Sequence, residues 1–114
     1  MKRLEAIVKN DKLSQVVAAI RSAGAKGVTV TSTKGQGSAS RPMIRSGRGT
    51  SQLQAEYNTM NNIMTVVDDS EVSAVVSAIT DAAYTGNNGD GIVFVSDVVQ
   101  VVNIASKKTD STAL

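Results

Sequence analysis

The sequence contains two similar halves, and this internal repeat restricts the possible folds more than any other feature. Each half has an amphipathic segment with apolar residues at positions i, i+3, i+4 and i+7 of a helix. These residues are Leu13, Val16, Val17 and Ile20 in the first half and Val72, Val75, Val76 and Ile79 in the second. The two segments lie 59 positions apart, and the same offset places Ile7-Val8 on Val66-Val67. The pattern predicts two units of the same kind in tandem.

In the first half the helical segment lies between two strand-like segments. Residues 2–9 alternate in polarity, and residues 27–34 are rich in β-branched side chains. The residues of the first strand that share one face are Leu4, Ala6 and Val8. Asn10 or Asp11 can cap the helix, and Gly24 suits its C-terminal stop. This half therefore predicts a strand, a helix and a second strand.

The second half repeats this layout. Asp68 and Glu71 resemble a capping box before the second helix, and Gly86 is expected to end that helix. The expected strands are residues 62–67, residues 92–95 and a short extra strand at 98–104. The two halves together predict two βαβ units of like phase.

Two βαβ units in tandem predict an α+β fold of the ferredoxin-like type. This βαββαβ sandwich has one four-stranded antiparallel sheet with two helices on a single face. The other face of the sheet then has no cover within the chain. We expect Leu4 and Val30, or the residues that alternate with them, to make that face apolar. Such a face favours assembly with further copies of the chain.

The 114 residues are expected to form a single domain over residues 1–114. Between the halves, residues 35–59 have no clear period, and we expect a long flexible loop there. The loop is basic, because Arg41, Arg45 and Arg48 precede its first acidic residue. The polar residues 105–114 are expected to form a mobile tail.

The composition excludes several classes of function. The chain has no cysteine and no histidine, which removes disulfides, thiolate nucleophiles, Ser-His-Asp catalysis and the usual zinc sites. The net charge of +2 is too small to indicate a general nucleic-acid surface. No apolar run approaches the roughly 20 residues of a membrane span. We expect a soluble cytoplasmic protein without a metal site.

Residues 85–91 read TGNNGDG, an unusual density of glycine and asparagine just before an apolar strand. Both residue types tolerate positive φ, so successive N–H groups can converge into an anion-binding nest. The alternative is a helix C-cap followed by a tight turn. A second glycine-bearing corner, KGQG at 34–37, is expected at the same end of the sheet. Two such corners, from one subunit or from two, make a cleft that can take a nucleotide.

These stretches resemble those of a known family. In order, TVTSTKGQG at 29–37, the long loop, and TGNNGDGIVFV at 85–95 resemble the TVTEVKGFG and TGKIGDGKIFV stretches of PII nitrogen-regulatory signalling proteins. The opening MKRLEAIVKNDKL resembles the first strand and helix start of that family. The resemblance implies a non-enzymatic homotrimer that binds an adenine nucleotide in each inter-subunit cleft. It also implies that the long loop contacts a protein target, such as a membrane transporter or a metabolic enzyme.

The resemblance also assigns a nucleotide site, residue by residue. Thr29 would face the base, and the backbone of Gly89, Asp90 and Gly91 would hold phosphate. The full set of residues expected to line the site is Ile7, Thr29, Gly35, Gly37, Val66, Gly89, Asp90 and Gly91.

The chain departs from the family at the charged positions of that site. Family cations align with Ile92, Asn103, Ala105 and Met60, a family glutamate aligns with Met64, and the glutamine that organises magnesium and 2-oxoglutarate has Ala39 as its nearest counterpart. Each lost charge-assisted hydrogen bond contributes roughly 1.5–3 kcal/mol, against about 8 kcal/mol for a whole micromolar complex. The expected ligand is therefore AMP, cyclic AMP or ADP in preference to ATP sensed together with 2-oxoglutarate.

The loop arginines offer replacement cations. The segment MIRSGRG resembles the basic loop of PII-like proteins associated with bicarbonate transporters, which bind cyclic AMP and other adenine nucleotides. Arg45 and Arg48 are expected to close over a ligand with one or two phosphates. Tyr57, in the stretch AEY, resembles the family's modified tyrosine and is the candidate for modification, against a plain loop tyrosine.

Three other functions remain open from the sequence. A ligand-free oligomer that binds a partner through the same fold is the main alternative. An acylphosphatase-like hydrolase would use Asn87 or Asn88, but no paired acid or base accompanies them. An RNA-binding module would need aromatic residues on the sheet, where Phe94 is the one candidate.

Overall fold

A computed structural model describes residues 1–37, 43–45 and 52–114 of the chain. The first half consists of β1 (Lys2–Lys9), α1 (Leu13–Ser22) and β2 (Thr29–Gly35), and the second of β5 (Asn58–Val67), α2 (Val72–Ala83) and β6 (Gly91–Asp97). Two short strands, β3 (Met43–Arg45) and β4 (Gln52–Gln54), lie between the halves. The 3-10 turns are η1 (Asn10–Lys12), η2 (Asp69–Glu71), η3 (Asn88–Asp90) and η4 (Asp110–Ala113).

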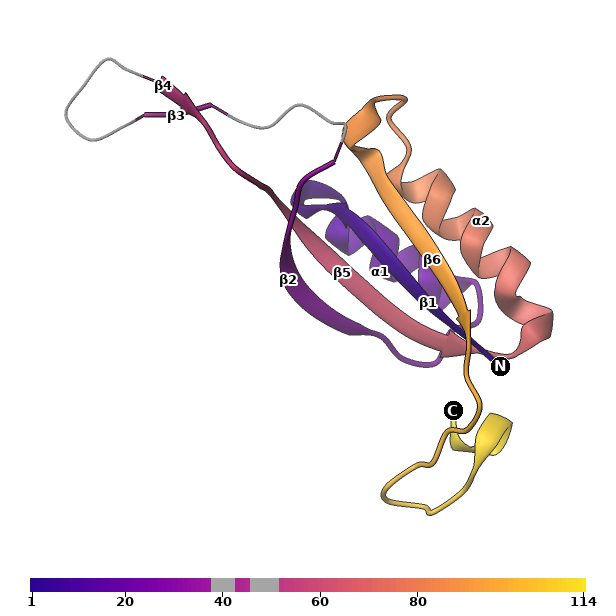
Figure 1. The fold of residues 1–114 in the computed structure, drawn as a ribbon. Coiled ribbons are helices and arrows are strands. Elements are labelled where there is room, and N and C mark those ends of the chain that lie inside the picture. The colour runs from indigo at the N-terminus through magenta and orange to yellow at the C-terminus, as the bar shows by residue number, and fades with distance from the viewer. Residues whose placement is uncertain (38–42, 46–51) are drawn as a thin grey trace.

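The main sheet has four strands in the order β2-β5-β1-β6, and every neighbouring pair is antiparallel. Both helices lie on one face of this sheet (Figure 1). This arrangement confirms the ferredoxin-like βαββαβ fold that the repeat predicts. Strands β2 and β6 form the two edges, because each pairs on one side only within the described chain.

The core lies between the sheet and the helices. Leu4, Ala6 and Val8 of β1 are buried, as the alternation of residues 2–9 predicts. They pack with Val16 and Ile20 of α1, Val75 and Ile79 of α2, and Ile63 and Val67 of β5. Both helical stripes of the repeat therefore face inward. Gly24, with a φ of +117°, follows the end of α1 and confirms the predicted stop.

The face of the sheet that the helices do not cover is formed by the residues that alternate with Leu4, and not by Leu4 itself. The register pairs Leu4 with the buried Thr65, which places Leu4 on the helix-covered face. The residues that alternate with it form the outer face, where Ile92 is 53% and Phe94 is 50% exposed. Glu5 also lies on that face, paired with Phe94 across the strands. The outer face is thus apolar along β6 and carries a charge on β1.

The segment between the halves contains a hairpin that the sequence did not indicate. β3 pairs with β4, and Met43 lies opposite Gln54 in this two-stranded sheet. The hairpin lies away from the main sheet (Figure 1). β5 begins at Asn58, inside the stretch predicted as loop and earlier than the expected start at residue 62. The flexibility of residues 35–59 stays a prediction.

Three local predictions in the second half were wrong. Asp68 does not cap α2 with its side chain, because that carboxylate accepts a hydrogen bond from Ser111 Oγ at 2.5 Å. α2 ends at Ala83, three residues before Gly86. Residues 98–104 form no strand. They turn back through one isolated bridge between Val102 and Thr109. The mobility of residues 105–114 stays a prediction.

None of the helices in the described part of the chain is long and apolar enough to cross a membrane.

Candidate functional site

The glycine-rich corner between α2 and β6 is built around the carboxylate of Asp90. One oxygen of Asp90 accepts hydrogen bonds from the amides of Thr85 at 2.6 Å and Gly86 at 2.9 Å. The other oxygen accepts from the hydroxyl of Thr85 and from Lys9 Nζ, the latter at 3.3 Å. These donors hold the pKa of Asp90 well below its usual range, and the hydrogen bond from the Thr85 side chain is the largest cause. Asp90 is therefore an internal anion that folds the corner.

This internal anion determines which amides remain for a ligand. The amides of Thr85 and Gly86 are used by Asp90, and the amide of Asp90 donates to Asn87 O at 3.2 Å. In the described part of the chain, the amides of Asn88 and Gly89 have no hydrogen-bond partner. The amides that remain available for a ligand are thus those of η3, and the hydrogen bonds of Asp90 hold this turn in place.

Gly91 brings the corner against the first strand. Its φ is +120°, and a Cβ built on Gly91 would lie 1.9 Å from the carbonyl oxygen of Ile7. Ile7 pairs with Ile92, the next residue of β6. Three of the residues that the resemblance assigns to the site, Gly89, Gly91 and Ile7, are therefore close together at one edge of the sheet.

Lys9 is a cation at this corner that the sequence analysis did not identify. It ends β1, and its ammonium group contacts the carboxylate of Asp90. Its side chain is about one third exposed, so it can also reach a ligand. The antiparallel pairing of β1 with β6 carries Lys9 to Asp90, and that pairing follows from the predicted fold. The strand register, combined with the positions of the charged residues in the sequence, would have identified Lys9 as this cation.

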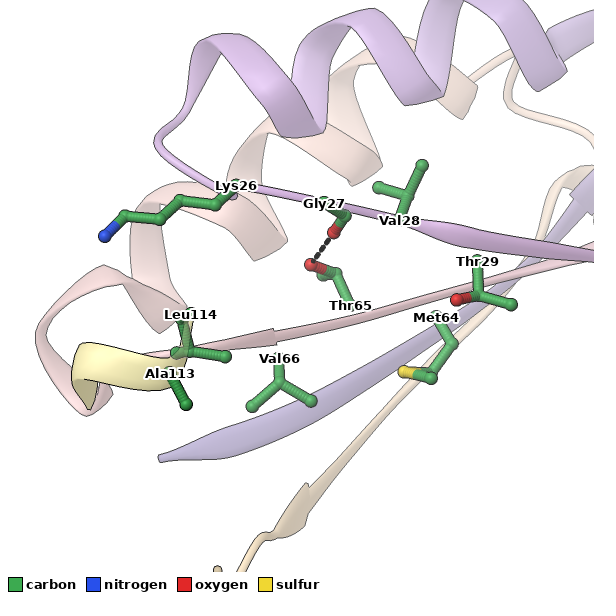
Figure 2. Close-up of a pocket in the computed structure, with 9 residues that line it drawn as sticks. All are labelled: Lys26, Gly27, Val28, Thr29, Met64, Thr65, Val66, Ala113 and Leu114. Carbon is green, nitrogen blue, oxygen red and sulfur yellow. Dashed lines mark hydrogen bonds between the residues drawn. The ribbon is translucent and has the colours of Figure 1, made fainter. Parts of the chain in front are cut away.

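Thr29 and Val66 lie elsewhere, at the junction of β2 and β5. They line a pocket of about 350 Å³ together with Met64 (Figure 2). The full lining is Lys26, Gly27, Val28, Thr29, Met64, Thr65, Val66, Ala113 and Leu114. Thr65 Oγ1 donates to Gly27 O at 2.6 Å and fixes the start of β2 against β5. The walls combine aliphatic side chains with polar groups in nearly equal measure, and residues 27–29 contribute backbone and hydroxyl groups.

The two groups of site residues lie at opposite edges of one sheet. Thr29 is on β2 and Gly91 on β6, with β5 and β1 between them (Figure 1). Three inter-strand spacings separate them, which is about 14 Å. Gly35 ends β2 and pairs with Asn58, and Gly37 follows two residues later. One copy of the chain therefore does not bring the Thr29 pocket and the Gly91 corner together.

The loop residues are described only in part. The backbone of Arg45 pairs with Gln52 in the β3–β4 hairpin, and Arg48 lies outside the described residues, as do Arg41 and Ala39. Tyr57 is exposed between β4 and β5. A contact of these arginines with a ligand stays a prediction, as does modification of Tyr57.

At two of the positions where the resemblance places a family cation, this chain has an uncharged residue with a different structural role. Ile92 is half-exposed on β6 next to the corner. Asn103 lies in the turn after β6, where its side chain accepts hydrogen bonds from the amides of Ala105 and Ser106, each at 3.0 Å. No group of three or more acidic side chains that suits a metal ion occurs in the described ranges.

Comparison with known proteins supports the same interpretation over nearly the whole chain. The sequence model for "Nitrogen regulatory protein P-II" matches residues 1–108. The chain is 36% identical over 114 residues to the nitrogen regulatory protein P-II of Rhizobium meliloti and 38% identical to that of Nostoc punctiforme, with 100% of both chains covered in each case. It is 35% identical to nitrogen regulatory protein P-II 2 of Methanothermobacter thermautotrophicus, of which it covers 97%.

Proposed function

The chain belongs to the P-II family of nitrogen regulatory proteins, and from this premise we propose that it binds an adenine nucleotide between the subunits of a homotrimer. Its membership of this family of signal proteins confirms the prediction that it is not an enzyme. In the proposed mechanism the nucleotide changes the state of the loop at residues 35–59, and the loop then selects a target protein in the cytoplasm. The target is a transporter or a metabolic enzyme.

The observation that carries this proposal is the division of the site between the two edges of the sheet. A pocket of about 350 Å³ lies at the β2 edge, and two amides without a hydrogen-bond partner in the described residues lie at the β6 edge. A nucleotide spans both only where the β2 edge of one copy meets the β6 edge of another. The division thus favours a ligand held between subunits over one held within a single chain.

The exposed apolar surface supports assembly independently. Val99 is 97% and Ile104 is 94% exposed, and both follow the half-exposed strand β6. Ile92 and Phe94 on the outer face of β6 are also half-exposed, so β6 and the segment after it present several apolar side chains to solvent. Solvent-exposed apolar patches of this extent mark association surfaces. A second copy of the same chain covers them in a ring such as a trimer.

The phosphate end is suited to a small charge. The amides of Asn88 and Gly89 and the ammonium group of Lys9 provide two neutral donors and one cation. Charge-assisted hydrogen bonds contribute roughly 1.5–3 kcal/mol each, so one lysine and two amides match one or two phosphates better than three. This supports AMP, cyclic AMP or ADP as the ligand, with Arg45 and Arg48 of the loop as further cations.

The loop offers a contact surface for the target. Met43 and Leu53 are exposed on the β3–β4 hairpin, which lies away from the main sheet (Figure 1). The register places these two side chains on opposite faces of the two-stranded ribbon, and either one can insert into a groove of another protein. The proposal assigns the hairpin to target recognition and the sheet edges to ligand binding.

Titration calorimetry with AMP, cyclic AMP, ADP and ATP, together with native mass spectrometry, tests the proposal. We expect a trimer that binds AMP or ADP at protein concentrations of about 100 μM or below. Lys9→Gln should weaken AMP binding by about 10-fold or more, because it removes a charge-assisted contact. Lys12→Gln is the matched control, since Lys12 lies in η1 and, within the described residues, forms no hydrogen bond or ion pair with the corner.

Two outcomes would contradict the proposal. A trimer that gives no heat with any of the four nucleotides would favour the ligand-free oligomer of the same fold. Equal AMP affinities of the wild type and of Lys9→Gln would contradict the part of the proposal that assigns Lys9 to the site.

A further inference from the structure

The corner between α2 and β6 contains an asparagine that is followed by glycine. Seven asparagines occur in the sequence, and Asn88 alone precedes a glycine, Gly89. At such a bond the backbone nitrogen of the second residue can attack the asparagine side chain, because glycine has no side chain that obstructs the approach. The corner lies at one end of the sheet, away from both ends of the chain (Figure 1). The reaction then depends on how the side chain and the nitrogen are held.

Both reacting groups of this pair are free in the structure. Asn88 is exposed, and neither its side-chain amide nor the backbone nitrogen of Gly89 has a hydrogen-bond partner in the described residues. They lie in the three-residue turn η3, whose closing backbone hydrogen bond runs from Asp90 N to Asn87 O at 3.2 Å. That distance is at the long end of the usual range. Local opening of the turn therefore costs little free energy and lets the Gly89 nitrogen approach the Asn88 side chain.

Comparable side chains elsewhere in the molecule are held by hydrogen bonds. Asn61 is buried and donates to Asn10 Oδ1 at 2.6 Å, and the side-chain oxygen of Asn103 accepts two backbone amides. Asp90 also precedes a glycine, but its carboxylate accepts four hydrogen bonds, and its lowered pKa keeps it ionised. An ionised carboxylate does not react with an amide nitrogen. Asn88 thus combines the reactive sequence with groups that form no hydrogen bond within the described chain.

We propose that Asn88 is a site of spontaneous deamidation and that an anionic ligand on the corner prevents this reaction. The Gly89 nitrogen attacks the side-chain carbonyl carbon of Asn88, and the new N–C bond closes a cyclic imide. The side-chain amide leaves as ammonia and takes the proton from the Gly89 nitrogen. Water then opens the imide at one of its two carbonyls and leaves aspartate or isoaspartate at position 88. Water is the only co-reactant, so no enzyme or cofactor is required.

The protective half of the inference rests on the proposed function. A phosphate that accepts a hydrogen bond from the Gly89 amide keeps the proton on that nitrogen and holds the turn closed, so the attack stops while ligand is bound. The product of the reaction adds a second carboxylate to the corner, beside Asp90. Like charges repel at short range, so the modified corner loses affinity for a phosphate. The protein would therefore lose ligand binding slowly during the time that it spends without ligand.

Peptide mass spectrometry after incubation of the intact protein at physiological temperature measures the reaction. We expect first-order conversion of Asn88, with the mass increase that accompanies replacement of an amide by an acid and with isoaspartate among the products. Asn61 and Asn103 are the internal references and should stay unconverted over the same period. AMP at about ten times its Kd should slow the conversion by about 10-fold, because only the free fraction reacts.

Two variants test the two ends of the argument. Gly89→Ala should slow the conversion severalfold by obstructing the approach, and its backbone accepts alanine because its φ is not positive. Asn88→Asp reproduces one product and should weaken AMP binding in calorimetry by about 10-fold. Ser73→Asp is the matched control. It adds the same charge on the exposed first turn of α2, at the end of that helix away from the corner, and should leave AMP binding unchanged.

The outcomes distinguish this inference from the proposed function. If Asn88 is still unconverted in the ligand-free protein when a peptide of residues 84–92 has been converted, or if Asn61 or Asn103 is converted sooner, the site is refuted. If AMP binds without changing the rate, the protective half is refuted and the nucleotide function stands. If Asn88 is converted at one rate with and without each of the four nucleotides and calorimetry detects no binding, the modification site stands and the proposed function fails.

Discussion

Replacement of Gly91 by alanine should separate β6 from β1 at the point where the corner joins the sheet. The added Cβ would lie 1.9 Å from Ile7 O, 3.0 Å from Ile7 C and 3.3 Å from Val8 Cα. These are backbone atoms of the central strand, so no side-chain rotation relieves the overlap. The backbone of Gly91, with φ +120° and ψ −166°, is also in a region that is open essentially to glycine alone.

The expected loss of stability follows from two contributions. The backbone conformation costs roughly 1–3 kcal/mol for a residue with a Cβ. Relieving the overlap opens the first rung between β6 and β1, and a lost hydrogen bond adds about 1 kcal/mol. Together these give about 2–4 kcal/mol, a large part of the 5–15 kcal/mol that is typical of a whole domain. The midpoint of thermal unfolding should fall by about 10–15 °C.

Chemical denaturation at one fixed protein concentration measures this loss, because assembly would make the midpoint depend on concentration. Gly35→Ala is the matched control. A Cβ on Gly35 would have nothing within 4 Å, and its φ lies outside the positive range. We expect the control to stay within about 0.5 kcal/mol of the wild type. A Gly91→Ala variant as stable as the control would refute the close approach of the corner to β1.

Three further predictions concern the core, a buried hydroxyl and the corner carboxylate. Ile20→Ala should lower the free energy of unfolding by about 2–5 kcal/mol, because Ile20 is fully buried, and an effect below about 1 kcal/mol would contradict the core packing. Thr65→Val should cost about 0.5–1.5 kcal/mol by removing the hydrogen bond from the buried Thr65 hydroxyl to the carbonyl of Gly27, which a urea titration would detect. The lowered pKa of Asp90 means that its carboxylate stabilises the folded chain above about pH 4 and that this contribution is lost as the pH falls further. Asp90→Asn should therefore be less stable than the wild type at pH 7 and lose less stability on acidification, whereas Asp81→Asn, on the exposed surface of α2, should follow the wild type.

The architecture could be predicted from the sequence because the apolar pattern of the core is strong and occurs in both halves of the chain. The apolar spacing in α1 and α2 and the alternation in β1 each correspond to buried faces in the structure. The start of β5 was missed because residues 58–61 read NTMN and carry no apolar alternation. Their pairing with β2 is set by the neighbouring strand, which a local pattern does not contain.

The parts of the site that were missed depend on contacts between distant residues. Asp68 and Glu71 have the spacing of a capping box, but Ser111 competes for the Asp68 carboxylate across the molecule. The sequence analysis looked for a cation directly after the GDG stretch, where the chain has the uncharged Ile92. The cation that contacts this corner is Lys9, which comes from β1. Spacing within the chain predicts neither contact, whereas the strand register accounts for the second.

The position of Thr29 and Gly91 at opposite borders of the sheet has a genetic consequence. If each ligand site is formed by the β2 border of one molecule and the β6 border of another, a mutation at one border inactivates one site. The other border of the same molecule stays intact and can still contribute to a second site. Two chains, one defective at Thr29 and the other at the Gly89 corner, would then restore an intact site when mixed in one ring. Each ligand site would then be formed by a pair of subunits, and two different mutant alleles would complement one another within a single oligomer.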